Sequence, residues 1–275
     1  MDYKLPGRVE NSNKRTYGKV LNIAGSEYMP GAAYLSSASA LKMGCGYCIL
    51  ITPSCVRASV AANSPSIVFG SECLVTTYFD DVDAVEIGCG LSQNKTAQDL
   101  FFQTVSKLPC KTPLIVDADG LNILSKNVDF FKKCNRGNVV LTPHPKEASR
   151  LLSCPLEEVL CDIKAAAKKI SEKYNCITVL KTHKTYVYSP DGREYTNNTG
   201  NNSMAKAGSG DVLTGMISAL AAQGMDLFEA SALGVYLHGL CGDLAKEKLT
   251  EYCVMAEDLI SFIPEAVKYY KKYCS

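Results

Sequence analysis

Six short apolar runs alternate with helical patterns along the first two thirds of the chain, and this alternation constrains the fold more than any other feature. The runs carry apolar residues on both faces, as buried parallel strands do. They are KVLNIAGS, GYCILIT, DAVEIG, PLIVDAD, NVVLTPH and CITVLKT. Helical patterns such as PGAAYLSSASALKMG, TAQDLFFQTVSKL and PLEEVLCDIKAAAKKISEKY separate them. The sequence therefore predicts a three-layer α/β fold, with a mainly parallel sheet and helices on both faces.

The last third of the chain follows a different pattern. KTYVYSP and REYTN flank Pro190-Asp191-Gly192, a turn sequence that predicts a β-hairpin. From Ser209 onward the apolar periodicity predicts three helices. No linker, internal repeat or low-complexity stretch interrupts the sequence, so we expect residues 1–275 to form a single domain.

Charge and hydropathy argue against several classes of protein. The formal net charge of the chain is +1, from 29 basic and 28 acidic side chains, which argues against a nucleic-acid partner bound by bulk electrostatics. The first residues, MDYKLPGRVENSNKRTYGK, lack the apolar core of a signal peptide, and no window reaches the length of a membrane span. We therefore expect a cytoplasmic protein without membrane contact, whose partner is a small molecule.

The cysteines are numerous for a chain of this kind. There are 13 of them, an odd number, and they are scattered through apolar stretches, which predicts reduced, mostly buried thiols rather than disulfides. Cys45 and Cys48 form a C-x-x-C motif, for which redox chemistry or metal binding is the alternative. The motif leads into the β-type run YCILIT instead of opening a helix, and this favours a structural role.

The residues that follow each predicted strand are the first candidates for a site, because ligands of open parallel sheets bind at the carboxyl ends of the strands. These ends are rich in Gly, Asp, His or Lys. They read AGSEYMPGAA, IGCGLS, DADGLN, TPHPKE and KTHKT. Asp117 and Asp119 could hold magnesium through water or could act as cap and turn residues, and the sequence leaves them unassigned.

The segment AGSGDVLTG joins a glycine turn to the start of a helix. Its glycines let backbone amides converge on an anion, and the helix start adds unpaired N–H groups and the positive end of the dipole, so a phosphate is the expected ligand. Asp211, in the first turn, is either a helix cap or the base that orients an attacking hydroxyl. The same field stabilises its carboxylate, so we expect a low pKa for Asp211.

Together these motifs resemble the NAD(P)H-hydrate dehydratases, a family with the fold of the ribokinase-like small-molecule kinases. TPHPKE with AGSGDVLTG at this spacing is the most specific pair. In that family an adenine nucleotide phosphorylates the hydroxyl of hydrated NADH or NADPH, and loss of phosphate regenerates the dihydronicotinamide. The resemblance covers nearly the whole chain and runs through KRTYGKVLNIAGSEYMPGAAYLSSASALKMGCG, IGCGLSQ, VDADGLN, LTPHPKEASRLL, VLKTHKTYV, NNTGNNSMAKAGSGDVLTG and VYLHGLCGDLA.

The resemblance implies a set of site residues, with Asp211 as the catalytic base. Around the hydrated dinucleotide it places Ala33, Gly90, His144 and Asp211. The phosphates and adenosine of the nucleotide are implied at Lys181, Thr182, His183, Lys184, Thr185 and Gly210. Supporting or phosphate contacts are implied at Asn198, Lys206 and Gly208, and for Lys206 a solvated surface lysine is the alternative. No metal ligand is implied.

The three histidines are expected to differ in their roles. His144 lies between Pro143 and Pro145, which fix the backbone around it, and this favours a ligand contact over a structural role. His183 lies in the nucleotide segment and is expected to contribute its backbone alone. His238, inside a predicted helix, is expected to pack in the core.

Four positions depart from the pattern of the family, and one of them is in the segment NNTG, which has asparagine for proline. Thr182 stands where glycine usually follows Lys181, which would alter the approach of the backbone to the nucleotide if a positive φ were required there. Cys89 stands where the family tends to have proline, and Lys146 stands where glycine is common. These departures bear on affinity more than on reaction type, because Asp211 and His144 are retained.

The resemblance also implies the co-substrate and the partners of a lyase that acts in metabolite repair. The co-substrate is ADP or ATP with Mg²⁺, and ADP is favoured because AGSGD is similar to the bacterial pattern. We expect a homo-oligomer, a tetramer, and an NAD(P)H-hydrate epimerase as functional partner. The chain lacks room for the epimerase domain that many relatives carry, so we expect it to act on the (6S) epimer alone.

Two other functions remain open at this point. A ribokinase-like kinase acting on a vitamin-precursor alcohol would stop at the phosphoester. A non-catalytic nucleotide-binding protein would keep the anion site alone, but the carboxylate of Asp211 argues against it, because that charge repels a phosphate.

Overall fold

A computed structural model describes residues 3–134 and 137–273, and within them the strands form one sheet of nine. The strands are β1 (Lys19–Ile23), β2 (Tyr47–Ile51), β3 (Val68–Phe69), β4 (Ala84–Ile87), β5 (Leu114–Val116), β6 (Val139–Leu141), β7 (Ile177–Leu180), β8 (Tyr186–Tyr188) and β9 (Glu194–Thr196). Their order is β3-β2-β1-β4-β5-β6-β7-β8-β9. Neighbours from β3 to β7 pair in parallel, whereas β8 pairs antiparallel with β7 and β9. The predicted mainly parallel sheet and the predicted hairpin are confirmed.

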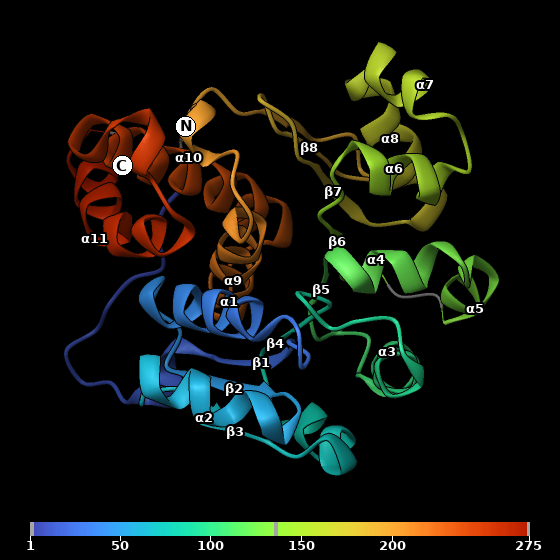
Figure 1. Ribbon diagram of the computed structural model, residues 1–275, viewed down its shortest axis with the longest axis horizontal. Coiled ribbons are helices and arrows are strands. Elements are labelled where there is room, and N and C mark those ends of the chain that lie inside the picture. Colours follow the sequence, from blue (N-terminus) through green and yellow to red (C-terminus); the bar gives the residue numbers. More distant parts are fainter. Residues whose placement is uncertain (1–2, 135–136, 274–275) are drawn as a thin grey trace.

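Helices cover both faces of this sheet (Figure 1). They are the short 3-10 helices η1 (Lys14–Tyr17), η2 (Glu72–Asp81) and η3 (Asn202–Met204), and the α-helices α1 (Pro30–Lys42), α2 (Ser54–Asn63), α3 (Lys95–Lys107), α4 (Ala118–Ser125), α5 (Val128–Lys133), α6 (Pro145–Leu152), α7 (Leu156–Cys161), α8 (Ile163–Tyr174), α9 (Ser209–Ala222), α10 (Leu227–Cys253) and α11 (Ala256–Tyr273). The three helices predicted after Ser209 are α9, α10 and α11. The helices α2, α4, α5 and α6 and the strand β3 were not predicted. The single helix predicted over residues 155–174 is divided at Asp162 into α7 and α8.

Two apolar cores lie on the two faces of the sheet. Alternate residues of each central strand point to opposite faces, so Val20 and Ile115 face the core shared with α1, α9, α10 and α11. Leu21 and Val116 face the other core, which is shared with α3, α4, α6 and α8. Burial on both faces explains why these strands read as continuous apolar runs in the sequence.

The carboxyl ends of the central strands meet at one edge of the sheet. The pairing register aligns Ile23 with Ile87, Ile87 with Val116, and Val116 with Leu141. The residues that follow these positions, among them Gly88 and Asp117, therefore lie along a common edge. Helix α9 packs over β1, β4 and β5 on one face.

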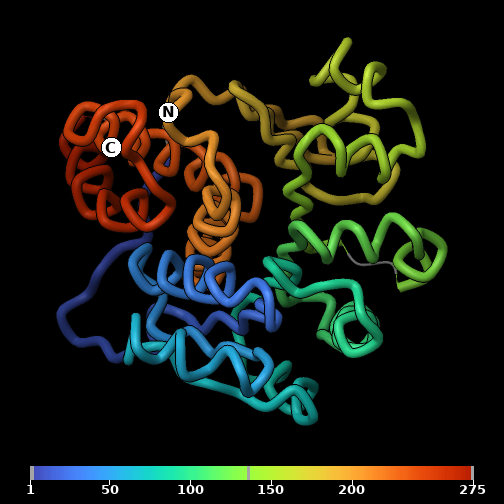
Figure 2. Tube along the Cα trace, viewed as in Figure 1, coloured from blue at the N-terminus to red at the C-terminus, as the bar shows by residue number. Residues whose placement is uncertain are grey.

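The N-terminal segment lies against the last helix, as the trace in Figure 2 shows. The hydroxyl of Tyr270, which is fully buried, donates a hydrogen bond to the backbone oxygen of Tyr3. Among the described helices, none combines the length and the apolar character that crossing a bilayer requires.

The expectation of mostly buried cysteines is wrong for the described residues. Cys45, Cys48, Cys89, Cys176 and Cys241 are buried, whereas an equal number of exposed cysteines occupy surface positions, namely Cys55, Cys73, Cys110, Cys161 and Cys253. Every described cysteine is a free thiol, and Cys274 lies outside the described residues. Burial raises the pKa of Cys45 to about 12 and that of Cys48 well above its usual range, so neither half of the C-x-x-C motif is a reactive thiolate.

Candidate active site

Helix α9 begins at a glycine turn beside the carboxyl edge of the sheet. Gly208 precedes the helix with φ 91°, a backbone angle that favours glycine. A Cβ built there would lie 2.5 Å from Leu35 Cδ1, so the Leu35 side chain would also have to shift. Ser209, Gly210 and Asp211 then form the first turn. The Ser209 amide donates to the Lys206 carbonyl at 3.4 Å, whereas Gly210 and Asp211 are the other residues of the helix start that could offer amides to an anion. Anion binding at this turn stays a prediction.

Lys181, at the end of β7, brings a positive charge to this anion site. Its Nζ would lie 3.3 Å from a Cβ built on Gly210, so the ammonium group sits against the first turn of α9. The same Nζ lies 2.6 Å from Asp117 Oδ1, and the Thr214 hydroxyl donates to Asp117 Oδ2 at 2.8 Å. Burial opposes the charge of Lys181, but the carboxylates of Asp117 and Glu147 outweigh it and raise the pKa of Lys181, which therefore remains a cation.

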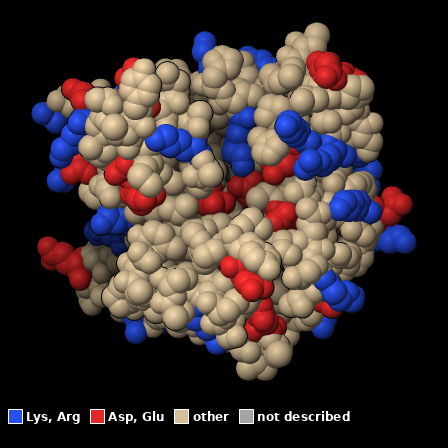
Figure 3. Space-filling view, in the orientation of Figure 1, with Lys and Arg blue, Asp and Glu red and all other residues tan. Residues whose placement is uncertain are grey.

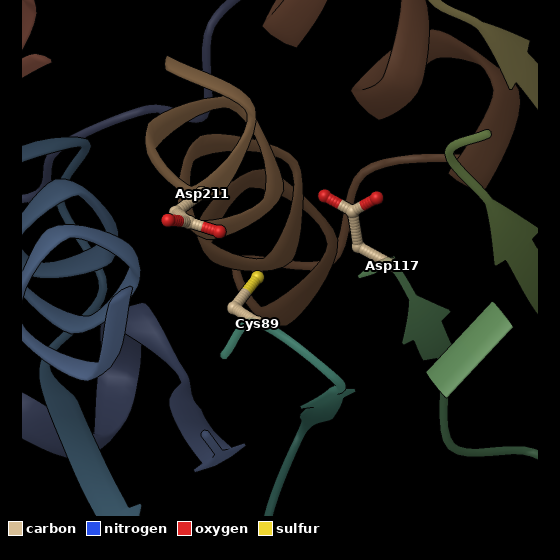
Figure 4. Close-up of side chains that lie close together, drawn as sticks. All are labelled: Cys89, Asp117 and Asp211. Atoms are coloured by element: carbon tan, nitrogen blue, oxygen red, sulfur yellow. The ribbon is translucent and has the colours of Figure 1, made fainter. Parts of the chain in front are cut away.

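Asp211 points towards Cys89 and Asp117 (Figure 4). Burial and, to a smaller extent, the negative charge of Asp117 raise the pKa of Asp211 to about 6, and a hydrogen bond from Cys89 only partly opposes this. The expectation of a low pKa for Asp211 is therefore wrong, because removal from water outweighs the helix dipole. The alternative of a helix cap is not supported either, since Gly208 is the cap residue and no side chain caps this helix.

His144 caps the start of α6 and has a defined tautomer. Its Nδ1 accepts a hydrogen bond from the Lys146 amide at 3.1 Å, so the proton of the neutral ring lies on Nε2, which is 3.4 Å from Glu147 Oε1. The Glu147 carboxylate accepts in return from the His144 amide at 2.8 Å. Burial, with a smaller contribution from Lys181, lowers the pKa of His144. Burial raises the pKa of Glu147 to about 7.

A cavity of about 650 Å³ opens beside the first turn of α9. One wall comes from the strand ends, through His144, Lys181 and Thr182, and another from the loop before α9 and from α10, through Gly210 and His238. In Figure 3 basic and acidic side chains meet at a hollow in the middle of the face shown. The volume is that of a typical small-molecule site.

Comparison with known proteins decides the family. A family model described as NAD(P)H-hydrate dehydratase matches residues 20–265. The chain belongs to the NAD(P)H-hydrate dehydratase family.

Named relatives and solved structures agree with this family. An ADP-dependent (S)-NAD(P)H-hydrate dehydratase of Neisseria meningitidis is 39% identical over 243 residues, which are 87% of this chain and 81% of that protein. The ADP/ATP-dependent NAD(P)H-hydrate dehydratase of Bacillus subtilis, co-crystallised with ATP and Mg²⁺, is 30% identical and superposes with a TM-score of 0.83 over 97% of this chain and 94% of that chain. A ribokinase-like superfamily protein of Enterococcus faecalis is 28% identical, with a TM-score of 0.87 over 97% and 92% of the two chains. The predicted ribokinase-like fold is confirmed.

The chain spans about half the length of the bifunctional NAD(P)H-hydrate repair enzymes that it also matches.

The structure separates the predicted residues of this dehydratase family according to whether they line the cavity. The first group lines the cavity and consists of His144, Lys181, Thr182, His183, Thr185, Lys206 and Gly210. His144, expected beside the dinucleotide, thus lies with the expected nucleotide residues. The second group, Ala33, Gly90 and Asp211, lies outside the lining of the cavity.

The second group is held together by close backbone approach. Gly90 has φ 59°, and a Cβ built there would lie 2.6 Å from the Cβ of Ala32 and 2.9 Å from that of Met29. Ala33 is fully buried against Gly25. The loop after β4 therefore packs against the start of α1, with Cys89 turned towards Asp211 (Figure 4).

Three further predicted residues, besides Ala33, Gly90 and Asp211, do not line the cavity. Lys184 and Asn198 are exposed outside its lining, and Gly208 shapes the turn without contributing to the wall. Thr182 is not among the described residues with positive φ, so its replacement of glycine imposes no strain there. Lys206 lines the cavity but is exposed, and its Nζ donates to the backbone oxygen of Tyr252 at 2.7 Å.

Sequence reasoning did not assign several polar residues of the site. The sequence does not assign a role to Asp117, because an aspartate after a strand is commonly a cap. In the structure Asp117 caps α4 and also forms an ion pair with Lys181. Thr214 and Glu147 lie one turn beyond residues that were assigned, and helical spacing was the available signal for both. His238 is buried as expected, but it also lines the cavity.

The potential metal ligands near the start of α9 do not form a complete Mg²⁺ site. Cys89, Asp117 and Asp211 have ligand atoms that all lie within 4.8 Å of one another. Mg²⁺ prefers oxygen ligands, and burial raises the pKa of Cys89 well above its usual range, which leaves a neutral thiol. Both oxygens of Asp117 already accept hydrogen bonds from Lys181 and Thr214. Asp211 is the carboxylate of this set that fits an ion arriving with nucleotide phosphates.

Proposed function

We propose that this chain dehydrates the (6S) hydrates of NADH and NADPH at the expense of ADP or ATP. The observation that carries this proposal is the division of the first turn of α9. Gly210 and Lys181 line the cavity, whereas Asp211, the next residue, lies outside its lining, with its carboxylate close to Cys89 and Asp117. A phosphoryl donor and an alcohol acceptor would meet across this turn.

Asp211 would act as the base during phosphoryl transfer. The hydroxyl oxygen of the hydrate attacks the terminal phosphorus, its proton passes to the Asp211 carboxylate, and the broken P–O bond leaves its electrons on the nucleotide. The amides of the α9 turn and Lys181 stabilise the charge on the transferring group. With a pKa of about 6, Asp211 is mostly ionised at neutral pH and is still a useful base.

The phosphoester would then collapse to the dihydronicotinamide. Phosphate leaves far more readily than hydroxide, and the lone pair of the ring nitrogen assists the breaking of the C–O bond. Loss of a proton from the neighbouring carbon forms the double bond and balances the dehydration. Mg²⁺ bound to the nucleotide phosphates would add charge neutralisation during the first step.

Incubation with hydrated NADH and either ADP or ATP tests the proposal. We expect the absorbance of the dihydronicotinamide to return while inorganic phosphate accumulates in equal amount. A stable phosphoester in place of free phosphate would indicate a small-molecule kinase instead. Nucleotide binding without any turnover would indicate a non-catalytic nucleotide-binding protein.

The remaining features of the enzyme are proposed on the strength of the family. We propose that residues 1–275 act as one domain, that the protein is a cytoplasmic homo-oligomer, a tetramer, and that an NAD(P)H-hydrate epimerase supplies its (6S) substrate. ADP is the proposed preferred nucleotide, since the Neisseria meningitidis relative is named as ADP-dependent. The contacts proposed for Ala33, Gly90 and His144 with the dinucleotide, and for residues 181–185 with the nucleotide, are part of the same proposal.

A further inference from the structure

Helix α10 holds both of the backbone segments that wall the cavity from that side. These are the first turn of α9 and the loop Thr199–Asn201, each contacted by side chains or backbone of α10. We propose that His238 and Asp243 of this helix are positioning residues, which aim the phosphate-binding amide of Gly210 and fix the neighbouring loop for nucleotide binding. This inference rests on the proposed nucleotide site.

His238 fixes the peptide unit that carries the Gly210 amide. Its Nε2 lies 2.9 Å from the carbonyl oxygen of Ser209, which has no proton to give, so the ring nitrogen is the donor. The Ser209 carbonyl and the Gly210 N–H belong to the same planar peptide and point in opposite directions. A hydrogen bond that holds the carbonyl against α10 therefore directs the amide away from α10. Gly210 and Lys181 both line the cavity, with Lys181 Nζ 3.3 Å from a Cβ built on Gly210.

The protonation state of His238 suits this task. The side chain is only 9% exposed, and burial lowers the pKa of His238 to about 4, although the bond to Ser209 acts in the opposite sense. The ring is therefore neutral at physiological pH, with its proton on Nε2. A neutral donor holds the carbonyl without placing a second cation inside the cavity wall, and it does so equally at every pH at which the enzyme would work.

Asp243 fixes the loop in the same way, with two hydrogen bonds. Its Oδ2 accepts from the Gly200 amide at 2.9 Å, and its Oδ1 accepts from Asn201 Nδ2 at 2.8 Å. The Thr199 hydroxyl adds a bond to the Tyr236 carbonyl at 2.8 Å. Thr199, Gly200 and Asn201 all line the cavity, so the three contacts determine the shape of that wall.

The close spacing between this loop and α10 depends on the absence of a side chain at Gly239. A Cβ built on Gly239 would lie 2.3 Å from Thr199 Oγ1 and 2.7 Å from the Thr199 carbonyl carbon. Backbone cannot yield at such distances, so any larger residue would push the loop off the helix. The short approach allowed by Gly239 is what places Asp243, one turn further on, within reach of the Gly200 amide.

Matched variants of His238 test its role through nucleotide affinity. His238→Gln keeps an N–H donor at nearly the same reach, whereas His238→Met fills a similar volume without one. We expect calorimetric titration with ADP to give a dissociation constant about five- to tenfold higher for His238→Met, the loss of one hydrogen bond, and a change below about twofold for His238→Gln. Equal affinities in His238→Met and the wild type would overturn the proposal.

A control in the same helix separates positioning from general stability. Cys241 is fully buried in α10 and does not line the cavity, so Cys241→Ala should lower the melting temperature while leaving ADP affinity unchanged. If Cys241→Ala weakens ADP binding as much as His238→Met does, the role assigned to His238 is wrong. A shift of the acid limb of the pH–rate profile in His238→Gln would also contradict it, since a neutral positioning group exchanges no proton.

Variants of Asp243 provide an independent test if His238→Met does not fold. Asp243→Ala removes both acceptors and should raise the ADP dissociation constant about fivefold, whereas Asp243→Asn keeps one carbonyl oxygen and should lie between it and the wild type. Equal ADP affinity in Asp243→Ala and the wild type would overturn the role of Asp243. Titration with ADP in the absence of the hydrated substrate measures nucleotide binding alone. A wild-type protein that binds ADP but does not dehydrate hydrated NADH or NADPH would therefore refute the proposed function without contradicting this inference.

Discussion

Lys181 Nζ lies 2.6 Å from Asp117 Oδ1, and the pair joins the ends of two strands that are separated by β6 in the sheet. The Asp117 side chain is 2% exposed and that of Lys181 is 20% exposed, so neither charge has free access to water. The pair sits under the first turn of α9, where the proposed phosphoryl group would bind. Its effects on stability and on chemistry can be separated by mutation.

Lys181→Met should destabilise the protein and reduce its activity together. Removing the ammonium group leaves the Asp117 carboxylate buried without its charge partner, which typically costs about 3–5 kcal/mol of unfolding free energy. The double variant Lys181→Met/Asp117→Asn should recover most of that stability in chemical denaturation but not the activity. Recovery of both would show that the pair is structural alone. Lys107→Met, on an exposed position of α3, is the matched control and should change neither quantity.

The pair also shows what the sequence could and could not predict. The strands were predictable because burial on both faces gives each of them a local apolar signature, as in KVLNI and PLIV. The glycine turn at Gly208 was also predictable from local sequence, because the glycines of AGSGD mark a turn directly before an apolar helical pattern. The contact of Asp117 with Lys181 was not, because 64 residues separate them and strand order alone brings them together. The pKa of Asp211 was predicted in the wrong direction, because burial by Cys89 and its surroundings is a tertiary effect that the helix start does not reveal.

Asp211→Asn should lower turnover strongly and, at alkaline pH, stabilise the fold. Loss of the base should lower the rate about 10²–10⁴-fold, with ADP affinity nearly unchanged. The folded pKa of Asp211, about 6, lies above its ordinary value of 3.8, so its contribution to stability is full below pH 3.8 and is lost as pH rises through 6. At pH 8 the variant should therefore be more stable than the wild type, by at most about 3 kcal/mol. Unchanged turnover would exclude the role of base.

Cys89 should set the acid limb of the activity profile through its bond to Asp211. The thiol of Cys89 donates to the Asp211 carboxylate and lowers the pKa of Asp211 against the effects of burial and Asp117. Cys89→Ala removes that donor, so the acid limb of the pH–rate profile should move to higher pH, whereas Cys89→Ser keeps a donor and should hold it near the wild-type position. Cys48→Ala, a fully buried cysteine of β2, is the control for lost packing. An unmoved limb in Cys89→Ala would show that the thiol does not act on Asp211.

Glu86 should make the protein progressively less stable as the pH rises. It lies in β4 beside Asn22 of β1, is 1% exposed, and neither of its carboxyl oxygens nor Asn22 Oδ1 has a hydrogen-bond partner among the described residues. Burial raises the pKa of Glu86 to about 8, against an opposing effect of the Ser218 hydroxyl. A protonated Glu86 carries no charge and has an O–H group that can donate a hydrogen bond, for which Asn22 Oδ1 is an acceptor on the neighbouring strand.

The sign of the effect follows from the two pKa values of Glu86. Between its ordinary value of 4.5 and the folded value of about 8, the native state holds a proton that the unfolded state has lost, so its contribution is full below pH 4.5 and is gone above pH 8. Each pH unit in this window should remove about 1.4 kcal/mol of unfolding free energy. Glu86→Gln, which is neutral in both states, should flatten this part of the curve measured by denaturant titration from pH 5 to 9. Glu194→Gln, on exposed β9, should leave the slope intact, and a slope retained in Glu86→Gln would show that another group is responsible.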